Sequence, residues 1–450
     1  MNKKKFYLAL IVFSLVGQIA WVVENMYFNV FIYKMFNASA SDISLMVEAS
    51  AIAATLTTIF IGALSDRIGK RKIFMCVGYI AWGVSIISFA LVRLDVITSL
   101  FGSTVSAASV GVTIVIILDC IMTFFGSSAN DAAYNAWLTD STDETNRGRA
   151  EGINSMMPLL AILVVFGGFM GFDLDKASSW TVIYIVIGAV VLLIGILGFF
   201  IVEDAPVQKK DELGYFRTIA YGFRPSVVKK NSKLYLTLIA FIVFGISIQV
   251  FMPYLLIYYE KTLEMSNYVL IMAPAIIVAA AVTAFYGKFI DRFGFKVSVF
   301  PSLASLGLGY VLLFVFPGFV KVEGAAMTVP VFIGSMLMLS GFLSGMAVFG
   351  AKIRNDTPVS MAGRFQGLRI IAQVLVPGVA GPAIGAAVLK DAEVVVNGDG
   401  TTSFLPDNRV FIAAFSAEAV LAAGLLVYYA VLKLKSVKQN AEAEKKDQNA

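Results

Sequence analysis

Residues 62–72 read Gly62-Ala63-Leu64-Ser65-Asp66-Arg67-Ile68-Gly69-Lys70-Arg71-Lys72 and join two long apolar runs. A related stretch, Gly287-Lys288-Phe289-Ile290-Asp291-Arg292-Phe293-Gly294, stands 225 positions later and also follows an apolar run. The first glycine lets a neighbouring helix approach closely, and the aspartate can accept hydrogen bonds at a helix N-terminus. The second glycine permits a tight turn, and the basic residues stay at the lipid headgroups. The repeat therefore predicts two membrane-embedded halves built on one plan.

The composition also indicates a lipid environment. Of the 450 residues, 58% are hydrophobic and 14% are charged, and the charged share is roughly half that of a soluble domain. Apolar runs near the ~20 residues that a helix needs to cross a bilayer recur at 6–33, 44–64, 73–92, 109–134, 153–172, 180–202, 234–259, 267–288, 296–317, 329–350, 367–389 and 410–432. The sequence thus predicts an all-α membrane protein with twelve transmembrane helices in two pseudo-symmetric six-helix halves.

The connections between the spans divide the chain. We expect a first half at 1–202, a cytoplasmic linker at 203–233, a second half at 234–435 and a disordered cytoplasmic tail at 436–450. Of the 35 Lys and Arg residues, 28 lie in the two tails and the even-numbered connections, and 7 lie on the opposite side. Because basic loops stay in the cytoplasm, we expect both termini there, in a monomer in the inner membrane of a bacterium.

Several functions are disfavoured. The only two cysteines, Cys76 and Cys120, lie inside apolar runs, so no disulfide framework is expected. There is no histidine, and the sequence suggests neither a nucleophile–base pair nor a metal cluster. The basic residues are scattered in short clusters, which does not favour nucleic-acid binding. We therefore expect a protein without enzymatic activity, cofactor or metal site.

Polar residues gather on one stripe of the first span. At about 100° per residue, one face carries Ser14, Gln18, Trp21, Asn25 and Asn29, with Glu24 beside it. Polar groups at membrane depth are costly unless they face protein or a water-filled cavity. Hydrogen bonding between helices is one interpretation. A cavity wall is the other, in which amides bond sugar hydroxyls and the indole offers a stacking face.

The fourth span is the other polar helix, with Asp119, Thr123, Ser127, Asn130, Asp131 and Tyr134. A carboxylate at mid-membrane costs about 2.5–3.5 kcal/mol, so two in one span predict a function in cation binding, proton transfer or substrate recognition. A structural ion pair of Asp119 with Arg369 or another basic residue is the alternative. The second half offers fewer such groups, with Gln249 deep in the seventh span.

The repeated stretch resembles the signature motif of the major facilitator superfamily. The resemblance implies a conformational lock that holds the two halves in one state of a transport cycle. Its residues here are Gly62, Asp66, Arg67, Gly69 and Arg71, with Asp291 and Arg292 in the second copy.

Three further patches resemble the glycoside–pentoside–hexuronide cation symporters, a sugar-transporting branch of that superfamily. They are Tyr27-Phe28-Asn29-Val30-Phe31, Asn130-Asp131-Ala132-Ala133-Tyr134, and Thr142-Asp143-Glu144 followed by Arg147-Gly148-Arg149. The resemblance implies that Asp131 contacts sugar and couples the cation. The branch also carries two acids in the second helix, and here Ala54 and Thr58 replace them. We therefore expect the proton rather than sodium as the coupling ion, and uncoupled transport or export is the alternative.

These patterns predict a secondary transporter for a sugar or glycoside, coupled to a cation. The expected substrate contacts are Gln18, Trp21, Asn25, Asp131, Tyr134 and Gln249. The expected coupling residues are Asp131, Asp119 and Glu24. An exporter of amphipathic or drug-like compounds is the main alternative, and a non-transporting receptor or scaffold on the same fold is the second.

The charge bias gives a test of topology. A reporter that is active only outside the cytoplasm should stay inactive when fused after Ala450, because the basic residues keep that end inside. The same reporter inserted after Asn397, in an odd-numbered connection, should be active. The reverse pattern would contradict the orientation.

Overall fold

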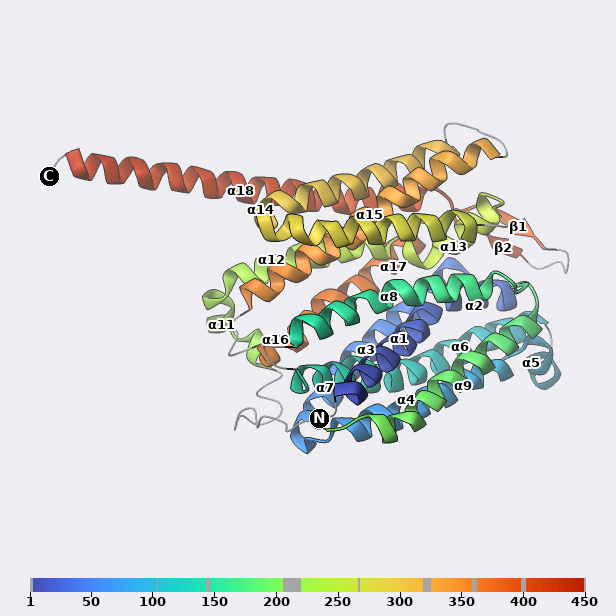
Figure 1. Cartoon of the computed structure of the whole chain (residues 1–450). Helices are drawn as coiled ribbons and strands as arrows, with labels where there is room; N and C mark the ends of the chain where they lie inside the picture. Colours follow the sequence, from blue (N-terminus) through green and yellow to red (C-terminus); the bar gives the residue numbers. More distant parts are fainter. Residues whose placement is uncertain are drawn as a thin grey trace.

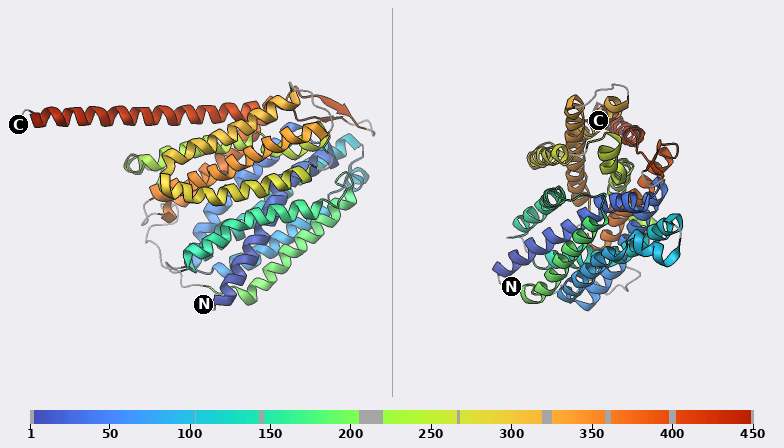
Figure 2. Two further views of the ribbon diagram at one scale, coloured as in Figure 1. Left: turned by 45° about the horizontal axis from the view of Figure 1, so that its top comes forward. Right: turned by 90° about the vertical axis from the view of Figure 1, so that its right-hand side faces the viewer.

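The computed structural model describes residues 3–102, 104–142, 146–204, 220–265, 268–318, 325–357, 362–397 and 402–448. Long helices run side by side through the molecule (Figure 1). The start of the first helix, residues 220–233 and the end of the last helix lie at one side of the bundle, which we call the terminal end. A small pair of strands lies at the opposite side, the hairpin end (Figures 1 and 2).

The first half contains six spans and one short connecting helix. Its elements are α1 (Lys3–Val22), η1 (Val23–Tyr27), α2 (Phe28–Phe36), α3 (Ala40–Ile68), α4 (Arg71–Ser88), η2 (Phe89–Leu91), α5 (Leu94–Phe101), α6 (Thr104–Gly126), η3 (Ser127–Tyr134), α7 (Asn135–Asp140), α8 (Arg147–Phe169) and α9 (Ala177–Ile201). The first span joins α1, η1 and α2, and the fourth joins α6, η3 and α7.

The second half repeats this plan after a connection that includes η4 (Ala220–Phe223) and α11 (Pro225–Lys230). Its elements are α12 (Ser232–Gln249), η5 (Met252–Tyr254), α13 (Leu255–Ile257), η6 (Tyr258–Thr262), α14 (Val269–Gly318), α15 (Ala325–Asp356), α16 (Ala362–Ile370), η8 (Ile371–Leu375), α17 (Val376–Val388), β1 (Val394–Val396), β2 (Thr402–Phe404) and α18 (Arg409–Gln448). The two strands are antiparallel, with Val395 opposite Ser403.

The described residues confirm the prediction of twelve spans. Ten helical stretches are long and apolar enough to cross a membrane. One of them is α14, which contains two spans joined at Gly294, where the backbone leaves the helical region (φ 71°, ψ 178°). The helix at Ile153–Phe169 is shorter but also apolar, and it completes six spans in each half.

The two signature motifs adopt related backbone geometry. Gly69 ends α3 in the left-handed region at φ 72°, and its N–H donates to the Ser65 carbonyl at 2.9 Å. Gly294, 225 residues later, has φ 71°. A side chain is unfavourable at positive φ, so both turns require glycine. Both copies of the repeat therefore turn at a glycine with positive φ, but ψ differs, at 19° for Gly69 and 178° for Gly294.

The linker and the tail are the two predicted segments that lie outside the two halves. The linker prediction at 203–233 falls partly outside the described residues, because 205–219 are not described. The tail differs from the disorder expected for 436–450, because α18 continues as a helix to Gln448. The physical reason is local, since residues 433–448 contain neither glycine nor proline and are rich in Lys, Glu, Ala and Gln, which are strong helix formers.

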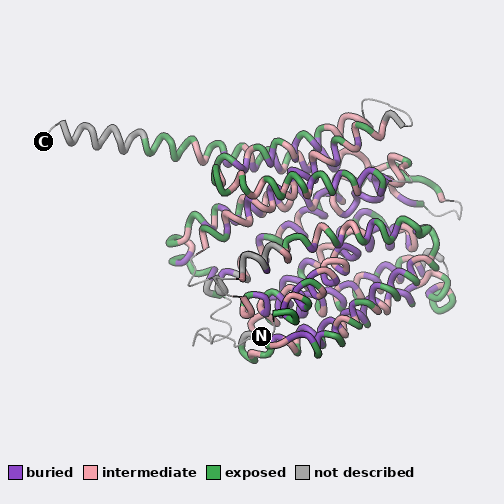
Figure 3. The backbone as a smooth tube through the Cα atoms, viewed as in Figure 1, coloured by how far each residue is buried: buried purple, intermediate pink, exposed green. Residues whose placement is uncertain are grey.

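Buried and exposed residues separate as expected for a protein in lipid. Purple, buried positions face the interior of the bundle, and green positions lie along its outside (Figure 3). The buried set includes Trp82, Trp137 and Trp180, whereas Val186 and Ile239 are exposed. A large exposed apolar surface is unfavourable in water, and the hydrocarbon core removes this cost.

Contacts between the halves seal the hairpin end. Lys34, whose side chain is only 4% exposed, pairs with Glu260 across the interface. It also lies 3.3 Å from Asp175, which in turn pairs with Lys261 of the second half at 3.3 Å. The Tyr33 hydroxyl donates to the Phe404 carbonyl at 2.7 Å.

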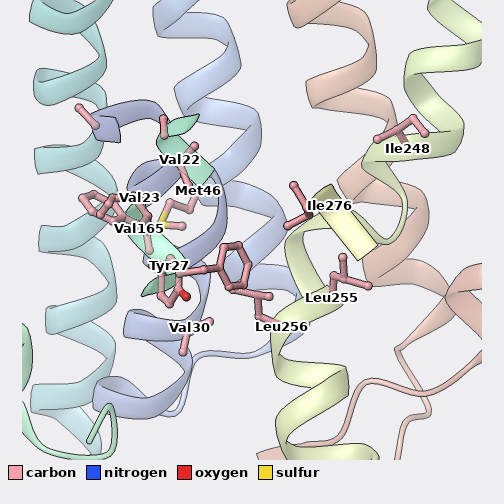
Figure 4. Packing of buried hydrophobic residues seen from close by; sticks show 14 of the residues in the cluster. Val22, Val23, Tyr27, Val30, Met46, Val165, Ile248, Leu255, Leu256 and Ile276 are labelled. Atoms are coloured by element: carbon pink, nitrogen blue, oxygen red, sulfur yellow. The ribbon is translucent and has the colours of Figure 1, made fainter. Parts of the chain in front are cut away.

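Apolar packing continues the seal toward the middle of the membrane. Figure 4 shows Val23, Tyr27 and Val165 of the first half on one side of this interface, with Leu256 and Ile276 of the second half on the other. All five side chains are buried. Opening this end therefore requires both ion pairs and apolar contacts to separate.

Removing the positive charge of Lys34 should open the hairpin end. In Lys34→Gln, Glu260 and Asp175 lose a shared partner, and a charged hydrogen bond contributes about 1.5–3 kcal/mol. Spin labels at Asp95→Cys and Val396→Cys, with Cys76 and Cys120 replaced, should show a longer or broader distance distribution.

The matched control is Lys176→Gln. Lys176 pairs with Asp173 of its own half at 3.0 Å, so this variant should leave the distribution unchanged. An identical distribution in Lys34→Gln and wild type would contradict a seal based on Lys34.

Candidate functional site

A chain of hydrogen bonds connects the first, third and fourth spans at mid-membrane. The half-buried Trp21 indole donates to Asn130 Oδ1 at 3.3 Å. Asn130 Nδ2 donates to the Tyr79 hydroxyl at 2.7 Å, and that hydroxyl donates to the Phe13 carbonyl at 2.7 Å. Every donor in this chain has a partner, as burial in a low-dielectric setting requires. The chain fixes the Trp21 ring beside Asn130.

Aromatic packing holds the same ring from the other side. The ring centroids of Trp21 and Trp82 are 5.0 Å apart, and those of Tyr79 and Trp82 are 5.4 Å apart. A Cβ atom at Gly126 would lie 2.7 Å from the Trp82 ring and 3.0 Å from Trp21. The absence of a side chain at this glycine is what lets both indoles approach the fourth span.

The candidate residues lie on helical segments with widened turns. The π-helical η1 carries Glu24 and Asn25, and the π-helical η3 carries Asn130, Asp131 and Tyr134. Such π-turns occur frequently at functional sites. They add a residue to the turn, so they rotate the following side chains away from the positions that an α-helix would give them.

A second cluster surrounds the buried Glu24 carboxylate. Its Oε1 accepts hydrogen bonds from Thr123 at 2.8 Å and from Ser50 at 2.9 Å. The two hydroxyl oxygens are themselves 2.8 Å apart. Asp119, which is 2% exposed, faces the Ser50 hydroxyl from α6. The cluster thus brings together polar groups of the first, second and fourth spans.

Asp131 is a more accessible carboxylate of the fourth span than Asp119. It is half-buried, and its Oδ2 accepts a hydrogen bond from Ser127 at 2.9 Å. It follows Asn130 directly, so it lies next to the Trp21–Asn130 contact. The partial exposure of Asp131 is suitable for a group that binds a ligand or exchanges a proton.

The other predicted substrate residues are more dispersed. Tyr134 is 2% exposed, and its hydroxyl donates to Asn154 of α8 at 2.8 Å. It therefore joins two helices and is not open to a ligand in this conformation. Gln18 is half-buried, and Asn25 is exposed with its amide donating to the Trp21 carbonyl at 2.8 Å.

Gln249 lies in the second half, at the crossing of α12 and α17. A Cβ atom at Gly381 would lie only 2.4 Å from the Gln249 Cβ, so these helices are in close contact here. The Gln249 side chain itself is half-buried. The structure thus joins Trp21 to Asn130, the neighbour of Asp131 in the chain, while Gln249 lies in the other half.

The predicted lock residues occupy the terminal end. Arg71 is 4% exposed, with Nε 3.1 Å from Asp140 Oδ2 and NH1 donating to Ser65 at 2.6 Å. This ties the motif to the end of the fourth span. Gly62, on α3, faces the same span, since a Cβ there would lie 3.9 Å from Ala132.

The remaining lock residues are exposed or not described. Arg67 is exposed, and the Asp66 side chain lies outside the described part of the chain. In the second copy Asp291 and Arg292 are both exposed, and the Arg292 guanidinium lies 5.2 Å from the centre of the Phe293 ring. The lock role of these residues remains a prediction.

Sequence reasoning missed four residues of the site. Tyr79, Trp82, Ser50 and Asn154 each contribute a contact described above, and Asn154 Oδ1 also accepts from Ser14 at 2.6 Å. None of them belongs to a stripe with the periodic polar spacing that identified the first and fourth spans. Among the described residues there is no group of three or more Cys, Asp and Glu side chains that could hold a metal ion.

The lack of a side chain at Gly17 allows the Trp21–Asn130–Tyr79 contacts. A Cβ atom there would lie 2.2 Å from Asn130 Nδ2 and 2.5 Å from the Tyr79 hydroxyl. Gly17→Ala should therefore lower the melting temperature in detergent, because overpacking costs about 1–3 kcal/mol. Gly424→Ala is the control, with no atom within 4 Å of the new methyl group, and it should not destabilise. Equal melting temperatures for the two variants would contradict the importance of Gly17.

Solved structures share this arrangement of helices. The nucleoside transporter NupG superposes with a TM-score of 0.66 at 13% identity, over 95% of this chain and 99% of NupG. The xylose transporter XylE from E. coli, in a partially occluded inward open conformation, gives 0.67 at 13% identity, over 94% and 99%. A bacterial homologue of the human lysosomal transporter Spinster, inward-facing and unoccupied, gives 0.63 at 16% identity, over 95% and 97%.

At these identities the likeness concerns the fold alone. No curated protein sequence gives a significant match to the chain. The family model described as Major Facilitator Superfamily matches residues 7–382, which is well over half of the chain. The chain therefore belongs to the Major Facilitator Superfamily and is a membrane transporter.

Proposed function

We propose that this transporter moves a sugar or glycoside by alternating access, in symport with a proton. The observation that supports the substrate class is the Trp21–Asn130–Asp131 group. It consists of the half-buried Trp21 ring, the buried Asn130 amide that holds this ring, and the half-buried Asp131 carboxylate that follows Asn130 in the fourth span. Aromatic rings pack against the apolar faces of sugars, and polar side chains fix their hydroxyls.

The pre-organised ring strengthens this proposal. Trp21 is held by its bond to Asn130 and by the Trp82 ring, so little side-chain freedom is lost when a ligand stacks on it. Two solved structures of the same fold, NupG and XylE, are named for a nucleoside and for xylose. Both compounds are polyhydroxylated, which favours the same substrate class for this chain.

The acidic residues of the spans favour the proton as the coupling ion. Metal cations require several oxygen ligands, and the second span has Ala54 and Thr58 where the resembling symporters carry acids. Asp131 is half-buried and adjacent to the proposed substrate contact. A carboxyl group in that place can take up a proton when its surroundings open to one side and release it to the other.

A ligand screen tests the substrate class. Purified protein should show a higher melting temperature with one or more sugars or glycosides, because a ligand at 100 times its Kd stabilises by about 2.7 kcal/mol. The shift should disappear in Trp21→Ala and decrease in Trp21→Phe, which keeps a ring without the N–H. Stabilisation by amphipathic cations alone would instead support the exporter.

Uphill transport tests the coupling residue. In proteoliposomes, Asp131→Asn should lose accumulation driven by a pH gradient while it keeps substrate exchange, because the amide cannot carry a proton. Asp173→Asn, a substitution in an exposed connection, should accumulate as wild type does. Accumulation that follows sodium and ignores the pH gradient would overturn the choice of ion.

A further inference from the structure

The Glu24 cluster contains two carboxyl oxygens that lack partners. Glu24 is 7% exposed and Asp119 is 2% exposed. Glu24 Oε2 and Asp119 Oδ1 are both buried, and neither has a hydrogen-bond partner among the described residues. An ionised carboxylate oxygen left without a partner in the membrane is costly, so each of these atoms requires something that the protein side chains do not supply.

The surroundings of the pair are acidic or neutral. The charged groups that act on Glu24 are Asp119 first and Asp131 second. Cys120 of α6 and Tyr184 of α9 also lie near Asp119, and Ser50 and Thr123 complete the cluster. No ion pair formed by the described residues reaches either carboxyl group. Two ionised carboxylates in this setting would repel each other without compensation.

We propose that Glu24 and Asp119 share one proton and form a proton-binding site separate from Asp131. The Ser50 and Thr123 hydroxyl oxygens lie within hydrogen-bond distance of Glu24 Oε1 and of each other, and their two hydrogens can form two of these three contacts. This leaves the two unpartnered oxygens, one on each carboxyl group, as the acceptors for the additional ligand. A proton placed on one of them neutralises that group and can serve as a donor to its neighbour, as in other carboxyl pairs that cannot both ionise.

The place of the pair suggests its role in transport, and this part rests on the proposed proton symport. The Glu24 carboxylate accepts a hydrogen bond from Thr123, which lies between Asp119 and Asp131 along the fourth span. Asp119 comes first along α6, which begins at the hairpin end, and Asp131 follows toward the terminal end. Glu24 and Asp119 therefore form a proton-binding site that lies between the hairpin end and Asp131.

Infrared spectroscopy tests the site without any transport assay. Near neutral pH exposed carboxyl groups are ionised, so the C=O stretching band of protonated carboxyl groups reports buried acids. Wild-type protein minus the double variant Glu24→Gln/Asp119→Asn should show such a band. Each single variant should alter the band, because each removes one of the two oxygens that share the proton.

Two matched variants define the assignment. Glu418→Gln removes a buried carboxylate of the second half, 3% exposed, and Asp131→Asn removes the proposed coupling group. Neither should change the band that the double variant lacks. The site is overturned if wild type and double variant give the same band, or if sodium but not potassium abolishes it.

The outcomes separate this site from the proposed function. If the band is present but Asp131→Asn still accumulates substrate, the pair stands and the coupling assignment fails. If Asp131→Asn loses accumulation and the double variant keeps the band, the coupling stands and the pair fails. Melting temperatures of all variants show whether each protein is folded.

Discussion

The bilayer core offers no water, so a polar side chain within a span is costly unless the protein or a water-filled cavity gives it a partner. This constraint explains the hydrogen-bond chain that runs from Trp21 through Asn130 and Tyr79 to the Phe13 carbonyl. It also explains why the polar residues of the first and fourth spans face each other. Three helices are held in register by these bonds, and the accessible groups of the candidate site are positioned by the same bonds.

The same constraint shapes the helices themselves. The π-turns η1 and η3 widen the first and fourth spans where their polar side chains lie. A widened turn leaves backbone bonds intact in the i→i+5 pattern while it rotates the side chains that follow. Glu24 can thereby reach Ser50 and Thr123, and Asp131 keeps partial exposure beside a buried Asn130. Local helix geometry thus separates a buried acid from an accessible one.

The two halves contribute unequally. The linked polar groups described above belong to the first half, whereas Gln249 and the buried Glu418 stand apart in the second. The halves meet through the ion pairs of Lys34 and the apolar contacts near Tyr27. A rocking motion of one half against the other would break the hairpin-end contacts and leave the first-half network intact. The polar groups of the first half would then remain on one rigid body while access changes.

The sequence by itself determined the membrane environment, the twelve spans and the two related halves, because hydropathy and the repeated glycine–aspartate motif are local properties. It also identified Glu24, Asp119 and Asp131, since acids inside apolar runs stand out. Only the tertiary structure decided their partners. Ser50, Tyr79 and Asn154 carry no periodic signal, and the assumption of 100° per residue fails at a π-turn, so the burial of Tyr134 and the exposure of Asn25 could not be derived. Which acids share a cluster depends on how separate spans cross, and that is settled by packing over the whole bundle.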